Sequence, residues 1–160
     1  MKIVGIVGWK NSGKTYFASN IIKKLKIKNY RVASIKHAHH EFDIDHKGTD
    51  SYIHREAGSS QVIVSSSKRW AKITELNDLR EQTLNYLLNQ LSEIDIVIVE
   101  GFKNDNHPKI EIIKKGNHDH LFNKIPNIKA VISQEKINTD LKQFKKDEID
   151  NIVNFILEDI

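Results

Sequence analysis

Eight consecutive residues near the start of the chain have the types and spacing of a phosphate-binding loop. They follow the apolar run 3–7, precede a helix-forming stretch and match the pattern G-x-x-x-x-G-K-S/T: Gly8, Trp9, Lys10, Asn11, Ser12, Gly13, Lys14 and Thr15. Glycines let the backbone turn its N–H groups toward phosphate oxygens, at the positive end of the following helix. The spacing predicts that Lys14 reaches the β- and γ-phosphates and that Thr15 binds Mg²⁺. A chance Gly-rich turn is the alternative, which the strand-before, helix-after context disfavours.

A second candidate is Glu100, which ends an apolar run over residues 96–99 and precedes Gly101. In a parallel sheet, ligands bind at the carboxyl ends of the strands, so a carboxylate there can order a Mg²⁺-bound water or an attacking water. The alternative is an acid that simply ends a strand. Beside a phosphate loop we favour a catalytic and metal-site role for Glu100. Asp95, at the start of the run, is expected to be structural.

The segment 36–50 is crowded with histidines and carboxylates. A zinc site is one interpretation, but no three of these residues show a specific ligand spacing. The segment follows a strand expected beside the first one, which fits a switch segment that holds Mg²⁺ and the γ-phosphate. We expect Asp43 or Asp45 to contact the ion through water, with Asp45 as a catalytic candidate and Asp43 as a nucleotide-binding one.

Two basic side chains could stabilise charge on phosphoryl oxygens, which requires a nearby cation. Lys10 lies inside the proposed phosphate loop, and Arg69 follows a Ser-rich stretch in an expected turn. A solvated turn residue is the alternative for Arg69. Both are candidate nucleotide-binding residues.

The elements that must position these residues alternate between strands and helices. β-Branched content predicts strands at residues 2–7, 31–35, 94–99 and 129–132, and helical spacing predicts helices at 16–27, 76–91 and 148–160. This alternation predicts an α/β fold, a P-loop NTPase-type three-layer sandwich. A hairpin at 61–65 and 69–76 and an edge strand at 109–113 predict a mostly parallel, partly mixed sheet. No linker composition interrupts the chain, so we expect one domain over residues 1–160.

The 160 residues carry a net charge of +4 and no cysteine. Disulfides, thiolate zinc sites and cysteine nucleophiles are therefore excluded. No apolar run approaches the ~20 residues that cross a bilayer, and no signal-peptide pattern precedes the first expected strand, so we expect a cytoplasmic protein. The basic excess is dispersed as lysine singles and pairs with four arginines in all, and nucleic-acid binding is not expected.

Taken together, these residues resemble the molybdopterin-guanine dinucleotide biosynthesis adapter (MobB) family of the P-loop NTPase class. The resemblance spans nearly the whole chain. Besides the phosphate loop, it is carried by residues 35–40 with 42–45, 49–51 through 55–58, and 99–103 with 108–111. The histidine stretch and E-G-F-K followed by P-K-I-E are far more particular than the phosphate loop alone.

The resemblance implies a homodimer that binds GTP with Mg²⁺, hydrolyses it weakly at most, and assists the molybdenum cofactor guanylyltransferase that attaches GMP to molybdopterin. It places Thr15 and Glu100 around Mg²⁺, and Asp43 and Asp45 near the nucleotide. One departure is Tyr16, followed by an aromatic, where a second Thr and an aliphatic residue are usual; we expect Tyr16 to alter packing near the α-phosphate. The base-reading motif N-K-x-D is absent, so guanine preference rests on the resemblance.

A small P-loop phosphotransferase acting on a small-molecule acceptor is the alternative function. A kinase of this size normally brings several arginines in a lid and a pocket for the acceptor. Four arginines and no Arg-rich lid disfavour that alternative.

Overall fold

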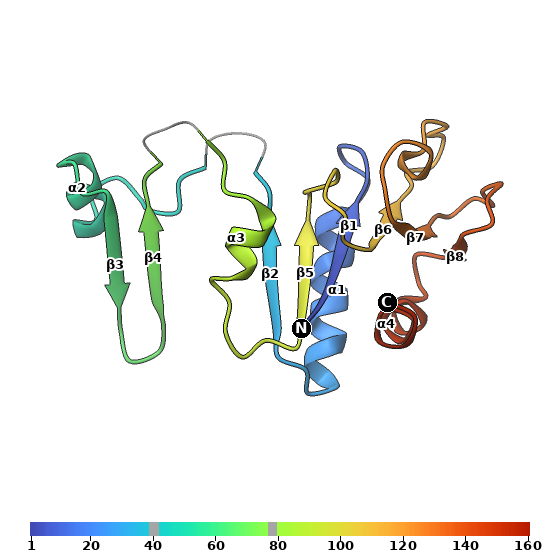
Figure 1. Ribbon diagram of the computed structural model, residues 1–160, viewed down its shortest axis with the longest axis horizontal. Helices are drawn as coiled ribbons and strands as arrows, with labels where there is room; N and C mark the ends of the chain where they lie inside the picture. Colours follow the sequence, from blue (N-terminus) through green and yellow to red (C-terminus); the bar gives the residue numbers. More distant parts are fainter. Residues whose placement is uncertain (39–41, 77–79) are drawn as a thin grey trace. The chain divides into compact units, whose positions relative to one another are not determined.

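The computed structural model describes residues 1–38, 42–76 and 80–160, drawn in colour in Figure 1. These residues gather into two compact units. The first comprises Met1–His37 with Leu84–Ile160, and the second comprises Ala38–Thr83. None of the helices in the described ranges is long and apolar enough to span a bilayer.

Six strands among the described residues of the first unit form a parallel sheet in the order β2-β5-β1-β6-β7-β8 (Figure 1). Their bounds are Lys2–Val7 (β1), Val32–Lys36 (β2), Ile96–Glu100 (β5), Lys109–Ile112 (β6), Ile128–Ile132 (β7) and Lys142–Phe144 (β8). The helices are α1 (Lys14–Ile27), α3 (Leu84–Leu88) and α4 (Ile149–Glu158), with a 3₁₀ turn, η1 (Leu121–Asn123). Because all six strands are parallel, their carboxyl ends share one edge of the sheet.

Hydrophobic side chains cover both faces of this sheet. Side chains alternate between faces along a strand, so Val4 and Ile98 pack with α1 and α4, whereas Val97 packs with Leu84 of α3 on the opposite face. The buried stripe of α1 comprises Phe17, Ala18, Ile21 and Leu25. Burying each large apolar side chain contributes about 1.5–3 kcal/mol, which holds α1, and the loop at its start, against the sheet. The predicted α/β three-layer sandwich is confirmed.

The second unit contains α2 (Asp50–Glu56) and an antiparallel hairpin of β3 (Gln61–Ser65) and β4 (Trp70–Thr74). Thr49 caps α2, because its hydroxyl accepts the N–H of Tyr52 at 3.3 Å. Ser66 closes the hairpin turn by donating its N–H to the carbonyl of Arg69 at 2.9 Å. The predicted Ser-rich turn between two strands is confirmed.

Most of the expected elements are confirmed to within two residues at each end, and four expectations need correction. The strand before the histidine-rich segment, β2, was expected beside β1, but β5 lies between the two. The antiparallel pair forms a separate two-stranded sheet, so the sheet of the first unit is parallel throughout its described strands rather than partly mixed. Strands that pair locally around a tight turn need no partner from the larger sheet. The patterns also missed α2 and β8, which are too short to show a clear period.

The expected helix over 76–91 is wrong for most of its length. Residues 77–79 lie outside the described ranges, and the helix observed is the single segment α3. Among the described leucines of this stretch, Leu84 and Leu88, about one turn apart, are the buried ones, and they pack against the sheet, whereas Leu76 is exposed. The leucine spacing resembled an amphipathic helix, but only one turn has an apolar surface to pack on.

The expected edge strand at 109–113 is also wrong, because β6 lies between β1 and β7. Lys109 and Glu111 are fully buried. The Lys109 ammonium donates to the carbonyls of Asp105, of His107 at 2.8 Å and of Pro126 at 3.0 Å. The polar-apolar alternation therefore reflects buried charges with internal partners, not a face in water.

His107 is a third buried polar side chain next to β6. Neither ring nitrogen has a hydrogen-bond partner among the described residues. Burial, and then the nearby Lys109 ammonium, lower the pKa of His107 from its ordinary 6.5 to about 4. At a pH between about 4 and 6.5, this imidazole is therefore neutral in the folded chain and largely protonated in the unfolded chain.

This pKa difference predicts that acid weakens the fold through His107. Between pH 6.5 and 4 the unfolded chain binds this proton more readily than the folded chain, so the free energy of unfolding falls as the pH drops through that window. From pH 7 to pH 5 the expected loss from this group is about 1–2 kcal/mol. Urea unfolding of the wild type and His107→Gln at both pH values measures it. Equal pH dependence in the two proteins would contradict the prediction.

Candidate phosphate-binding site

The predicted phosphate loop connects β1 to α1 at the carboxyl edge of the sheet. Gly13 forms the N-cap of α1 with φ at 98°, a left-handed conformation that residues other than glycine rarely adopt. The Ser12 N–H donates to the carbonyl of Trp9 at 3.2 Å, which closes the loop on itself. Residues 8–15 therefore form a closed turn that leads directly into the first turn of α1.

Unpaired polar groups line this loop. Among the described residues, the backbone N–H groups of Gly13, Lys14 and Thr15 donate no hydrogen bond. The hydroxyl of Ser12 is buried and also has no partner in the described ranges. The first turn of α1 contains no acidic residue that could satisfy the helix dipole. Such a set of donors at a helix N-terminus is suited to an anion with several oxygens.

The Lys14 ammonium is hydrogen-bonded to carbonyls of the loop that precedes it. It donates to the carbonyls of Gly8 and Trp9, both at 3.0 Å. Burial lowers the pKa of Lys14; the Glu100 carboxylate opposes that shift, and the ammonium groups of Lys36 and Lys103 add to it. The site therefore holds more positive than negative charge close to Lys14, which favours a polyanionic ligand.

The structure brings Thr15 and Glu100 together. Glu100 ends β5, and the Thr15 hydroxyl donates to its two carboxylate oxygens, both at 3.2 Å. The Lys36 ammonium lies 3.9 Å from the same carboxylate. A hydroxyl and a carboxylate side by side next to a phosphate cradle are oxygen ligands of the kind that Mg²⁺ accepts. The residues present therefore fit the ion predicted from the sequence.

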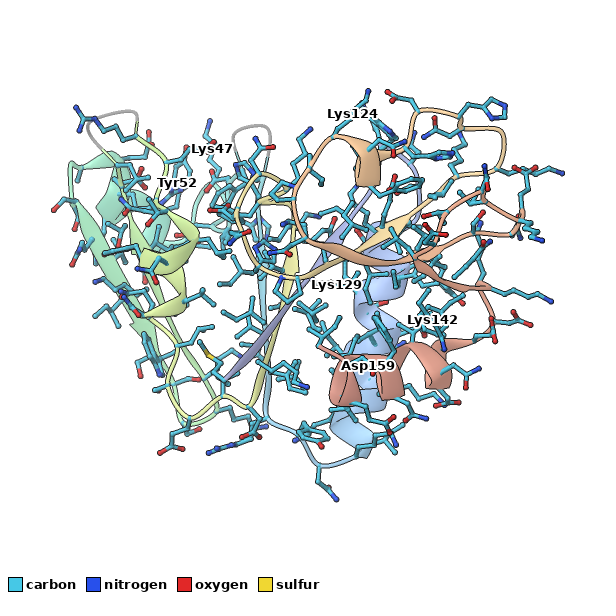
Figure 2. All side chains as sticks on the ribbon, turned by 45° about the vertical axis from the view of Figure 1, so that its right-hand side comes forward. Lys47, Tyr52, Lys124, Lys129, Lys142 and Asp159 are labelled. Atoms are coloured by element: carbon cyan, nitrogen blue, oxygen red, sulfur yellow. The ribbon has the colours of Figure 1, made fainter. Side chains whose placement is uncertain are left out.

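Trp9 joins the phosphate loop to the segment before η1. Its indole N–H donates to the carbonyl of Asp119 at 2.6 Å. The ammonium groups of Lys103 and Lys124 each lie 5.7 Å from the centre of its ring, within cation–π range. Figure 2 shows Lys124 at one end of the first unit and Asp159, which follows α4, toward the other. Basic side chains thus gather around the loop from several elements.

The remaining loop positions are exposed. Tyr16 is 59% exposed and contacts the ring of Phe17 edge-on, with 5.3 Å between ring centres. Lys10 is exposed as well. The predicted roles of Tyr16 at the α-phosphate and of Lys10 as a phosphoryl cation stay predictions.

Three predicted site residues belong to the second unit. Asp43 accepts a hydrogen bond from Arg55 at 2.7 Å. Asp45 accepts one from the Thr49 hydroxyl at 2.7 Å, which is the main reason that its pKa is lowered. Arg69 lies at the hairpin turn. Their proposed roles at the nucleotide stay predictions, and residues 39–41 of the histidine stretch lie outside the described ranges.

Sequence patterns missed three lysines of the site: Lys36, Lys103 and Lys124. They come from the end of β2, the segment after β5 and the segment after η1. Each is a single lysine in a lysine-rich chain, so only the strand order reveals that they converge. A usable signal for Lys36 and Lys103 is that each lies at or just beyond the end of an expected parallel strand.

Comparison with known proteins identifies the family. The sequence model of the family described as "Molybdopterin guanine dinucleotide synthesis protein B", MobB, matches residues 3–134. The chain belongs to the MobB family. The family predicted from the sequence is thereby confirmed, and the match includes the phosphate loop, Glu100 and the buried charges of β6.

Relatives and solved structures agree with this family over nearly their full lengths. Two proteins named molybdopterin-guanine dinucleotide biosynthesis adapter protein are similar: one from Escherichia coli (32% identical, 98% of this chain, 91% of the relative) and one from Haemophilus influenzae (35%, 96% and 86%). A crystal structure of molybdopterin-guanine biosynthesis protein B superposes with a TM-score of 0.80 at 28% identity, covering 99% of both chains. The structure of Bacillus subtilis MobB superposes with a TM-score of 0.79 at 28% identity, covering 98% and 96%.

Glu100→Gln tests whether this carboxylate serves the metal ion. The amide keeps the size of the side chain and removes its charge, so Mg²⁺-dependent strengthening of triphosphate binding should fall about tenfold. Calorimetric titrations with and without Mg²⁺ measure the change. Binding without Mg²⁺ should not weaken, because the removed charge repels phosphate. The same Mg²⁺ dependence in both proteins would assign Glu100 to structure alone.

Proposed function

We propose that this MobB-family chain is a GTP-binding adapter in molybdenum cofactor biosynthesis that assists a guanylyltransferase in forming molybdopterin guanine dinucleotide. The observation that carries the nucleotide part is the phosphate loop, with its free N–H groups and the Lys14 ammonium resting on loop carbonyls. The adapter part is supported by the names of relatives that match almost end to end.

The proposed ligand is GTP with Mg²⁺. The cradle suits a triphosphate, because the N–H groups and Lys14 supply donors while Thr15 and Glu100 offer oxygen ligands to the ion. Guanine preference is supported by the family, whose named product contains guanine, and not by an N-K-x-D motif. Mg²⁺ bound there would neutralise phosphate charge, and this chain's residues would hold and orient the phosphates.

Weak hydrolysis at most is part of the proposal. Arg31 is the single arginine of the first unit, and it pairs with Asp95 at 3.0 Å, at the opposite edge of the sheet from the phosphate loop. The cations close to Lys14 are lysines, which do not offer the forked geometry of a guanidinium on a transferring phosphoryl group. The phosphotransferase alternative is therefore not favoured.

A homodimer is the proposed assembly. The hairpin of the second unit carries Ile63 (65% exposed) and Trp70 (69% exposed) on one face. Ile63 pairs with Lys72, which lies two residues from Trp70 on the same strand and therefore on the same face. The other positions of this face are polar: Gln61, Ser65, Lys72 and Thr74. A two-stranded sheet is only marginally stable alone, and large exposed apolar side chains with polar neighbours around them favour association. A second copy of the chain would cover this face. The single domain over 1–160 and the cytoplasmic location stay predictions.

Titration with GTP and ATP in Mg²⁺, followed by assay with a guanylyltransferase at limiting GTP, tests the function. The wild type should bind GTP and increase dinucleotide formation. Lys14→Ala should lower triphosphate affinity about ten- to a hundred-fold, since it removes a charge-assisted contact. Lys26→Ala, at the far end of α1, should change neither result. Unchanged affinity in Lys14→Ala, or phosphate transfer to a small acceptor at a kinase-like ~1–100 s⁻¹, would contradict the proposal.

Trp70→Lys tests the homodimer. This change removes the larger apolar side chain of the face and adds an ammonium two residues from Lys72, so self-association should weaken by tenfold or more. Sedimentation velocity over a concentration series measures the effect. Ile27→Lys provides the control, since Ile27 is similarly exposed (74%) but lies at the end of α1 in the first unit. A monomeric wild type, or equal association in both variants, would rule out this dimer face.

A further inference from the structure

Glu111 is a fully buried carboxylate whose bonding partners lie in a loop. One of its oxygens accepts the N–H of Leu121 at 2.8 Å, and the other accepts the N–H of Phe122 at 2.9 Å. Burial raises the pKa of Glu111, and these two bonds oppose that rise. A buried carboxylate is tolerated only when donors satisfy it. The backbone at 121–122 is therefore fixed to the strand β6 at two points.

The segment held in this way is also the anchor of Trp9. The carbonyl of Asp119, two residues before Leu121, accepts the indole N–H at 2.6 Å. Lys124, two residues after Phe122, places its ammonium over the indole ring and forms an ion pair with the Asp119 carboxylate at 2.5 Å. A displacement of the backbone at 121–122 would move these two contacts of Trp9, whereas the third, with the Lys103 ammonium, comes from the segment after β5.

Trp9 in turn organises the phosphate loop. Its carbonyl accepts the N–H of Ser12 and the ammonium of Lys14. The preceding residue, Gly8, lies tightly against β6, since a Cβ there would come within 2.6 Å of the Ile112 carbonyl oxygen. The strand that carries Glu111 thus touches the loop directly at Gly8 and indirectly at Trp9.

We propose that Glu111 is a positioning residue for the phosphate loop, acting through the 119–122 segment and Trp9. It does not touch the ligand. Its two hydrogen bonds hold the anchor of Trp9 in place, so that the loop is ordered before an anion arrives and binding does not bear the cost of ordering it. The inference rests on the proposed nucleotide function. The alternative is that Glu111 only stabilises its own loop.

Glu111→Gln separates the two roles when Trp9 is observed directly. The chain contains two tryptophans, so Trp70→Phe leaves Trp9 as the only one. In that background and without nucleotide, Glu111→Gln should shift Trp9 emission to longer wavelength and increase its quenching by acrylamide, because one backbone N–H would face an amide N–H₂. Affinity for GTP with Mg²⁺ should fall about tenfold. Unchanged Trp9 emission would overturn the inference.

A double-mutant cycle shows whether the effect passes through Trp9. Trp9→Phe keeps an aromatic ring and removes the indole N–H, so it should itself lower affinity, and Glu111→Gln should cost much less in that background. Lys2→Met is the matched control, because it removes an ammonium that donates to the carbonyls of Ile156 and Leu157 at the start of β1, the end opposite the phosphate loop. Its effect on affinity should add to that of Trp9→Phe.

Each further outcome of the cycle decides between the two roles. Additive effects of Glu111→Gln and Trp9→Phe, or wild-type affinity in Trp9→Phe, would overturn the inference. If Glu111→Gln does not fold, Glu111→Asp, which keeps the charge but withdraws it by one methylene, takes its place in the same assays. A wild type that binds no triphosphate would refute the proposed function, whereas the emission of Trp9 would still decide whether Glu111 holds it.

Discussion

Loops that connect strands without a helix must still find hydrogen-bond partners for their buried backbone groups, and this requirement shapes the first unit. The connection from β5 to β6 is a short segment without a helix, so its carbonyls have no regular ladder of N–H donors. Lys109 supplies donors to that segment and to Pro126, and Glu111 supplies acceptors to the segment before β7. Two opposite charges on alternate residues of one strand thereby hold the two loops that flank the phosphate site.

Lys109 and Glu111 also show why sequence patterns succeed in some places and fail in others. The phosphate loop was predictable because its donors come from consecutive residues, so spacing alone defines the chemistry. The β1, β5 and β7 strands were predictable from short segments rich in β-branched residues. In β6 the alternation of Lys109, Ile110, Glu111 and Ile112 is indistinguishable from that of a half-solvated edge strand, since the pattern does not record whether a charge finds a partner inside.

Convergence of distant residues was the other failure. Lys36, Lys103 and Lys124 reach the site from three separate segments, and no local spacing links them. Glu100 was found because it ends a strand whose partner is the strand before the phosphate loop. The leucine spacing at 76–91 shows the opposite error, a predicted element that does not form over most of its length. A helical period leads to a helix only where an apolar surface can cover it, and here the sheet covers the single turn of α3.

The electrostatics of the site follow from where these lysines lie. Burial, and then Lys36 and Lys103, disfavour the charged form of Lys14, and the Glu100 carboxylate opposes them. The three ammonium groups repel one another. A ligand with several negative charges relieves that repulsion and gains the free N–H groups at the start of α1. A ligand that binds the folded chain and not the unfolded one also stabilises it. Under the proposed function, a partner protein that contacts the loops held by Lys109 and Glu111 would meet a phosphate loop stabilised by its nucleotide, without any catalytic group from this chain.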